Sequence, residues 1–299
     1  MKAVSYYITL PFLYLISLLP FPVFYLFSDF IFFLLYHVFG YRKQVVYDNL
    51  RNSFPEKTDA EIKQIRKRFY KYLCDLTLET FKTLTISKAE ASRRCSITPE
   101  SVEIFDRFYR EQKSVIIVMG HFGNWEWAGN TFSLNCQHQL YVIYHPLTNK
   151  YFDDLIYRMR TRFGTKLIPM RDTYRDMVKF KDELNATAFI ADQTPSPDNA
   201  YWTTFLNQDT PVFRGTEMIA RKVNYPVVYA SVKRKRRGYY EITAETLFEN
   251  PRSTKDGEIS EAHTRKLEQE IIAQPEIWLW SHKRWKHKRK ADVAPPSQA

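Results

Sequence analysis

The chain has 299 residues, of which 44% are hydrophobic and 16% aromatic, so it is long enough to bury a substantial core in one large domain. Its formal net charge of +11 at pH 7 admits three classes of partner: nucleic acid, an anionic membrane surface and a small acidic carrier protein. The three cysteines are widely spaced and form no Cys-x-x-Cys pair, which argues against a disulfide framework and a zinc site and fits a reducing compartment.

The N-terminal stretch predicts a hydrophobic membrane anchor. Residues 3–28 carry no charge and are rich in Leu, Phe, Tyr and Ile, and the apolar pattern resumes after Asp29. The stretch is long enough to span a bilayer. Pro20 and Pro22 interrupt it, so a single tilted span and a re-entrant hairpin in one leaflet both remain open.

Two basic residues, Arg42 and Lys43, close the apolar stretch. By the positive-inside tendency they place the following part of the chain in the cytoplasm. We therefore divide the chain into an anchor over 1–40, a folded domain over 41–290 and a polar tail over 291–299.

The folded domain is expected to be α/β. Apolar residues at intervals of three and four predict a helix over 59–84. Strands and helices alternate after it, with strands at 115–119, 140–144, 166–169, 186–191 and 226–232 and helices over 151–163, 173–183 and 216–223. Residues 239–243 are expected to pair antiparallel with the strand before them. This alternation is typical of a central, mostly parallel sheet flanked by helices.

Residues 120–129, Gly-His-Phe-Gly-Asn-Trp-Glu-Trp-Ala-Gly, follow the buried strand 115–119 directly. Gly120 and Gly123 can form a turn there, and Asn124 is a suitable N-cap for a helix that starts behind it. The segment is therefore expected to be a strand, a turn and a helix start at the carboxyl end of a strand.

This turn brings His121 and Glu126 together. In a continuous helix they would lie about 140° apart around the axis. With the turn, Glu126 falls in the first helical turn, from which its carboxylate can reach the imidazole. A carboxylate on one ring nitrogen leaves the other as a base near neutral pH, which predicts catalysis by His121. The alternative is an ordinary turn histidine beside a solvated acid.

The string His121-Phe-Gly-Asn-Trp-Glu126 contains His-x4-Glu, the signature of glycerolipid and lysophospholipid acyltransferases. In full it resembles the branch that contains the lipid A late acyltransferases, which add secondary acyl chains to Kdo-lipid A. The resemblance runs from the hydrophobic N-terminus to the Trp-rich C-terminus. It implies a membrane-associated acyltransferase that moves a fatty acyl chain from an acyl carrier protein or coenzyme A thioester to a hydroxyl of a lipid A-type glycolipid.

Several expectations follow from this resemblance. The protein would act at the inner membrane, facing the cytoplasm, and would need no metal and no cofactor beyond the thioester, which is already activated. His121 would be the general base, and Glu126 would hold its imidazole. The predicted substrate-binding residues are Asn124, Arg160, Arg162, Asp192 and Gln193.

Asp192 and Gln193 end the predicted strand 186–191, so they should emerge at the same sheet edge as His121 if the strands are parallel. The resemblance makes Asp192 an active-site residue that positions the acceptor or an arginine; a strand-ending Asp that caps a turn is the alternative. Arg160 and Arg162 match an Arg-x-Arg pair of the family and could grip a phosphate or oppose an oxyanion. Their alternative is a solvated helix face.

One position departs from the family pattern. His145 stands in Tyr144-His145-Pro146 where relatives commonly have Tyr-Arg-Pro, which leaves the acceptor open. A lysophospholipid or a mannosylated phosphatidylinositol is the alternative acceptor, and a non-catalytic membrane adaptor is the alternative from another class.

Two basic clusters, residues 233–237 and 281–290, are expected to rest on anionic lipid headgroups. Tryptophans interleave the second cluster, which would also suit nucleic acid. The family ends in a similar Pro-Glu-x-x-x-Trp-x-His-x-Arg segment, found here at 275–284. With the anchor, this favours the membrane surface over nucleic acid.

Overall fold

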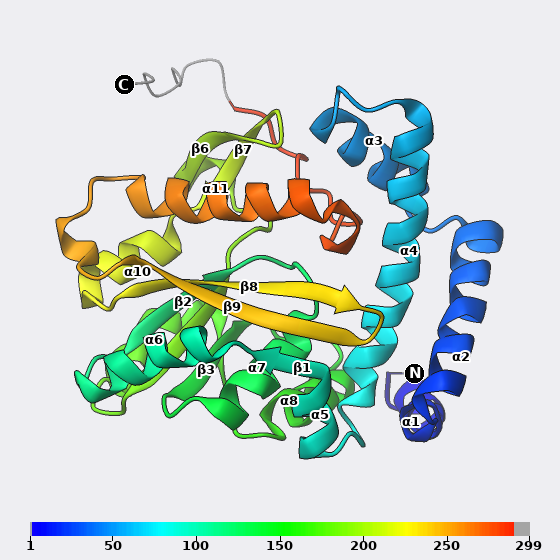
Figure 1. Cartoon of the computed structure of the whole chain (residues 1–299), viewed down its shortest axis with the longest axis horizontal. Helices are drawn as coiled ribbons and strands as arrows, with labels where there is room; N and C mark the ends of the chain where they lie inside the picture. Colours follow the sequence, from blue (N-terminus) through cyan, green and yellow to red (C-terminus); the bar gives the residue numbers. More distant parts are fainter. Residues whose placement is uncertain (1, 290–299) are drawn as a thin grey trace.

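The computed structural model describes residues 2–289 and contains one seven-stranded sheet in the order β1-β9-β8-β2-β5-β3-β4, with a separate β6–β7 hairpin (Figure 1). The strands are β1 (Cys95–Ile97), β2 (Val115–Met119), β3 (Gln139–Tyr144), β4 (Lys166–Pro169), β5 (Asn185–Ile190), β6 (Ala200–Phe205), β7 (Gln208–Phe213), β8 (Val227–Arg236) and β9 (Tyr239–Phe248). Neighbours in the seven-stranded sheet are parallel except β8 and β9. The predicted central, mostly parallel sheet is confirmed, including its antiparallel strand.

Helices cover both faces of this sheet. They are α1 (Lys2–Leu18), α2 (Phe21–Phe33), α3 (Lys43–Ser53), α4 (Asp59–Lys82), α5 (Lys88–Arg94), α6 (Pro99–Arg110), α7 (Trp125–Asn135), α8 (Lys150–Thr161), α9 (Thr173–Lys179), α10 (Gly215–Val223) and α11 (Glu258–Ala273). Shorter turns of helix are η1 (Leu34–Phe39), η2 (Met170–Asp172), η3 (Pro197–Asn199), η4 (Pro251–Ser253) and η5 (Pro275–Ile277). The predicted polar tail, 291–299, lies outside the described residues.

Strand β2 shows how the two faces are divided. Val115 and Ile117 pack in a cluster with α6 and α7, whereas Ile116 and Val118 pack in the cluster that contains α4, α10 and α11. This alternation is the period of two that a strand imposes on its side chains. Because both faces are covered, all four residues are buried, and the strand is a continuous apolar run.

Local signals explain where the predictions succeeded and failed. Helix α4 lies within the predicted range and begins with a capping box between Thr58 and Glu61. Helix α9 ends at Lys179, earlier than the predicted Glu183. The sequence analysis missed α3, α5, α6, α11, β1 and the β6–β7 hairpin.

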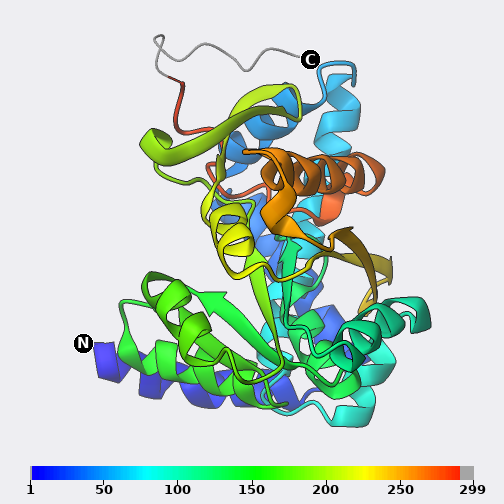
Figure 2. The ribbon, with the colours of Figure 1, turned by 90° about the vertical axis from the view of Figure 1, so that its left-hand side faces the viewer.

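The predicted anchor is a bent pair of helices. Helix α1 ends before Pro20, which is the N-cap residue of α2, so the chain turns there instead of continuing as one helix. The helical segment Phe21–Phe39 consists of α2 and η1. By length and composition alone, it could cross a membrane. Helix α1 runs across the bottom of the molecule in Figure 2 and contacts α8 and α4.

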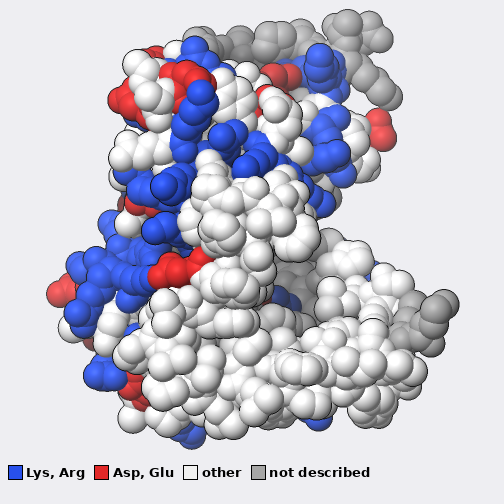
Figure 3. All heavy atoms as spheres, turned by 90° about the vertical axis from the view of Figure 1, so that its right-hand side faces the viewer, with Lys and Arg blue, Asp and Glu red and all other residues white. Residues whose placement is uncertain are grey.

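Much of the apolar surface of this helix pair is exposed. Leu26 and Phe39 are 70% and 73% exposed. In Figure 3, Lys and Arg side chains gather over the upper and left parts of the face, whereas its lower part is almost without charge. An uncharged region therefore borders a basic one on this side of the molecule.

In the basic cluster 233–237, Arg234 and Arg237 are engaged within the protein and are not free for lipid headgroups as predicted, whereas Lys233, Lys235 and Arg236 are exposed. Arg234 donates to Asp75 of α4 at 2.8 Å, and Arg237 forms ion pairs with both Asp75 and Asp29. Lys235 pairs with Glu241. Residues 233–236 form the end of β8, and Arg237 begins the β8–β9 turn. Arg234 and Arg237 thereby join this hairpin to α4 and, through Asp29, to α2.

Candidate active site

The turn after β2 has the predicted form. Asn124 is the N-cap of α7, and its Oδ1 accepts from the Trp127 backbone N–H at 2.9 Å. Gly123 has φ +60°, and a Cβ there would lie 1.8 Å from the Val232 carbonyl oxygen. Only glycine fits this close approach. The Tyr72 hydroxyl donates to the Gly123 carbonyl oxygen at 2.5 Å and holds the turn from α4.

Asp192 holds His121. Its Oδ1 lies 2.6 Å from His121 Nδ1, and its Oδ2 accepts from the His121 backbone N–H at 2.8 Å and from Trp278 Nε1 at 2.7 Å. The predicted meeting at one sheet edge is confirmed, since β2 and β5 are parallel neighbours with Met119 opposite Ile190. The carboxylate fixes the proton of the neutral ring on Nδ1 and leaves Nε2 as an acceptor.

The second ring nitrogen faces Gln193. The Gln193 amide nitrogen lies 3.4 Å from His121 Nε2. The Trp125 ring stands edge-on to the imidazole, with 4.9 Å between ring centroids. The His121 side chain is 17% exposed, so Nε2 lies in a partly desolvated position that a substrate can reach.

The predicted contact between Glu126 and the imidazole is wrong. Glu126 instead forms a two-pronged ion pair with Arg160, with Nε to Oε2 at 2.9 Å and Nη2 to Oε1 at 2.5 Å. Asp192 already occupies Nδ1, and α8 brings a guanidinium whose fork matches the carboxylate. Glu126 and Arg160 are thus a pair beside the histidine.

Two predicted binding residues, Asn124 and Arg162, already make hydrogen bonds within the protein. Asn124 is fully buried, and its side chain is used by the α7 cap and by Glu79, to which Nδ2 donates at 2.8 Å. Arg162 Nη1 donates to the carbonyl oxygens of Thr83 and Ile86, each at 2.6 Å. Neither contacts His121 in this structure, because α4 and the loop after it supply partners that the sequence pattern does not reveal.

Comparison with known families gives a match over nearly the whole chain. The family model described as bacterial lipid A biosynthesis acyltransferase covers residues 1–287. The chain belongs to this family. Comparison with curated proteins finds no match. The acyltransferase is therefore an enzyme of lipid A biosynthesis, and the resemblance seen in the sequence is confirmed.

Behind Asp192 the acyltransferase has a small cavity lined in part by two buried basic side chains, His263 of α11 and Arg284. Burial disfavours ionised Asp192, but the charge and hydrogen bonds of His121 and the Trp278 indole outweigh it and hold its pKa at about 2. Burial lowers the pKa of Arg284 to about 10, against the attraction of Asp192.

The C-terminal segment thus supports the site. Trp278 binds Asp192, His282 lies 3.1 Å from the Thr194 hydroxyl, and Arg284 Nη2 donates to the Pro211 carbonyl oxygen at 2.7 Å. The expectation that residues 281–290 rest on headgroups is wrong for Arg284, which is 2% exposed; Lys290 lies outside the described residues. The family-like string at 275–284 was the available signal for this role.

An apolar cavity opens on the other side of the sheet. Met119 and Trp125, which flank His121, line it together with Gly129 of α7 and, farther along, Phe105 and Phe132. The wall consists of apolar side chains and glycine. Within residues 2–289, no group of His, Cys, Asp and Glu has the arrangement of a metal site. The acyltransferase thus has an apolar cavity whose wall includes Trp125, the neighbour of His121.

The buried His263 predicts acid sensitivity. Burial lowers its pKa to about 4, against the attraction of Asp192. An unfolded histidine titrates near 6.5, so the unfolded chain binds more protons between these values, and stability falls as pH drops through that window. We expect a loss on the order of 3 kcal/mol of unfolding free energy from this group between pH 6.5 and 4. Denaturant unfolding of wild type and His263→Asn measures it.

His263→Asn should flatten this pH dependence, and His145→Asn, a change at an exposed histidine, should leave it as in wild type. An unchanged slope in His263→Asn would show that the buried imidazole is not the group that titrates.

Proposed function

We propose that the enzyme transfers a fatty acyl chain from an acyl carrier protein or coenzyme A thioester to a hydroxyl of a lipid A-type glycolipid, with His121 as general base. The 2.6 Å contact between His121 Nδ1 and Asp192 carries this proposal. It leaves Nε2 as the basic nitrogen, on the edge where parallel strands end and next to Trp125, which lines an apolar cavity.

The reaction needs one base and no covalent enzyme intermediate. His121 Nε2 takes the proton of the acceptor hydroxyl as its oxygen attacks the thioester carbonyl carbon. The carbon–sulfur bond then breaks, and the imidazolium returns the proton to the leaving thiolate. Asp192 stabilises the imidazolium, since its carboxylate is buried and ionised.

Arg160, Glu126 and Gln193 supply binding groups around this base. The pair with Glu126 uses Arg160 Nε and Nη2, so Nη1 remains to meet a phosphate of the donor or acceptor. The Gln193 amide lies next to Nε2 and can donate to an oxygen of the reacting groups. Glu126 contributes by orienting the Arg160 guanidinium.

The anchor and the charge suit a membrane enzyme with an acidic partner. The exposed apolar side chains of α1, α2 and η1 would lie in the inner membrane, and Arg42 and Lys43 favour a catalytic domain on the cytoplasmic side. The basic surface above them suits anionic headgroups and an acidic acyl carrier protein (Figure 3).

Replacement of the base tests the function. His121→Ala should lower acyl transfer by about 10²- to 10⁴-fold, because a positioned general base is lost, while the protein stays folded. Purified wild type and variant are assayed with acyl carrier protein thioesters and coenzyme A thioesters as donors and with a Kdo-lipid A acceptor that lacks its secondary chains. The products are identified by mass spectrometry.

Wild-type turnover in His121→Ala would refute the assignment of His121 as the general base. The proposed lipid A-type acceptor would be refuted if the wild-type enzyme acylated a lysophospholipid or a mannosylated phosphatidylinositol but left the Kdo-lipid A unchanged.

The apolar cavity predicts control of chain length. Gly129 lines it, and a Cβ there meets only the Leu140 side chain, at 3.8 Å, so Gly129→Leu can extend into the space. It should lower transfer of the preferred chain by roughly tenfold or more and shift products to shorter chains. A donor competition assay with thioesters of several lengths measures this.

Gly215→Leu is the matched control, since a side chain at Gly215 of α10 enters open space away from the cavity. The two variants should differ in chain preference. An identical product distribution would place the acyl chain elsewhere.

A further inference from the structure

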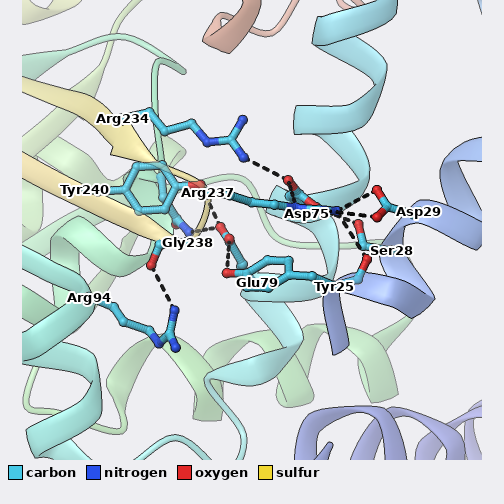
Figure 4. A network of polar contacts seen from close by, with 11 residues as sticks. Tyr25, Ser28, Asp29, Asp75, Glu79, Arg94, Arg234, Arg237, Gly238 and Tyr240 are labelled. Atoms are coloured by element: carbon cyan, nitrogen blue, oxygen red, sulfur yellow. Dashed lines mark hydrogen bonds and ion pairs between the residues drawn. The ribbon is translucent and has the colours of Figure 1, made fainter. Parts of the chain in front are cut away.

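Glu79 of α4 connects the turn that carries His121 with the anchor, and Figure 4 shows its contacts with Tyr25 and Tyr240. Its side chain is fully buried. Oε1 accepts from the Tyr25 hydroxyl of α2 at 2.8 Å, and Oε2 accepts from Asn124 Nδ2 at 2.8 Å and from the Tyr240 hydroxyl of β9 at 2.7 Å. One carboxylate therefore ties together a membrane-anchor helix, the turn that carries His121 and a strand of the sheet.

The backbone of α4 reinforces this link. The Glu79 carbonyl oxygen accepts from Trp127 Nε1 at 2.9 Å. A hydrogen bond from Tyr72 to Gly123 thus fixes the turn. Hydrogen bonds from Asn124 and Trp127 to Glu79 fix the start of α7. His121 lies two residues before Gly123, so a shift of this frame moves the imidazole relative to Asp192.

A carboxylate suits this position better than an amide. A carboxylate only accepts hydrogen bonds, and three donors converge on it. An amide nitrogen would oppose at least one of them. Burial, with help from Asp75, raises the pKa of Glu79, so the cluster of donors is what supports its charge.

The neighbouring polar contacts of α2 do not lead to the catalytic turn. Ser28 donates to Asp75 at 2.7 Å, and Asp29 pairs with Arg237. Both lie in the part of the network that joins α2 to α4 and to the β8–β9 turn (Figure 4). The Tyr25 hydroxyl is the contact from α2 that meets the same carboxylate as Asn124.

We propose that Glu79 is a positioning residue for acyl transfer, which fixes the His121 turn and, through Tyr25, makes its position depend on how α2 is seated. This role rests on the proposed function of His121 as the base. Loss of the Tyr25 contact with Glu79 would then lower turnover without changing any group that touches substrate.

The test compares Glu79→Gln, Tyr25→Phe and the control Ser28→Ala in the full-length enzyme, with kcat, KM for the acyl donor and thermal unfolding measured for each. Glu79→Gln should lower kcat roughly tenfold to a hundredfold, and Tyr25→Phe about threefold to tenfold, as expected for loss of one or more hydrogen bonds to a charged group. KM should change by less than about twofold. Ser28→Ala removes an α2–α4 hydrogen bond without touching Glu79, so its kcat should stay at the wild-type value.

Wild-type kcat in folded Glu79→Gln and Tyr25→Phe would overturn the proposal, and so would an equal loss in Tyr25→Phe and Ser28→Ala. If Glu79→Gln does not fold, the comparison of Tyr25→Phe with Ser28→Ala decides. His121→Ala distinguishes failure of the positioning role from failure of the proposed function. If His121→Ala is inactive but the Glu79 and Tyr25 variants keep wild-type kcat, only the positioning role is refuted. If His121→Ala is fully active, the proposed function is refuted as well.

Discussion

The contact between His121 and Asp192 is the constraint on which the site depends. It requires two parallel strands, β2 and β5, to end in register at one sheet edge, because the two residues follow these strands and lie 71 positions apart. The carboxylate is buried and still ionised, with a pKa of about 2. A buried charge is stable only when it is paired and hydrogen-bonded, and the imidazole, a backbone N–H and the Trp278 indole meet that need.

Helix α4 is the frame for this contact. One side of the helix holds the turn after β2 through Tyr72 and Glu79, and Asp75 holds α2 and the β8–β9 turn through Arg234 and Arg237. Removing one partner from such a buried network leaves a charge uncompensated, which is strongly destabilising. The apolar helix pair and the turn that carries His121 are therefore parts of one packed structure.

The sequence predicted features that depend on local chemistry. The buried strand before Gly120, the N-cap at Asn124 and the meeting of Asp192 with His121 at one edge follow from apolar runs, capping preferences and parallel strand topology. The fold class followed from the alternation of strands and helices.

The rest required tertiary contacts that no local pattern encodes. Glu126 is close to His121 in sequence, but its partner Arg160 comes from another helix and provides a better match for its carboxylate. Arg234 and Arg284 lie in basic runs that are typical of solvated surface, yet one meets Asp75 and the other is buried behind Asp192. Helix α11, which supplies His263, was missed among its many charged residues.

The most direct test of this account compares the turnover of Asp192→Asn with that of Glu126→Gln. The amide introduced by Asp192→Asn would keep the shape of the side chain but not the charge that fixes the tautomer and stabilises the imidazolium. We expect Asp192→Asn to lower kcat by about 10²-fold or more, and Glu126→Gln, which acts through Arg160, to lower it clearly less. Turnover near wild type in Asp192→Asn, with a loss in Glu126→Gln as large as that of His121→Ala, would contradict it.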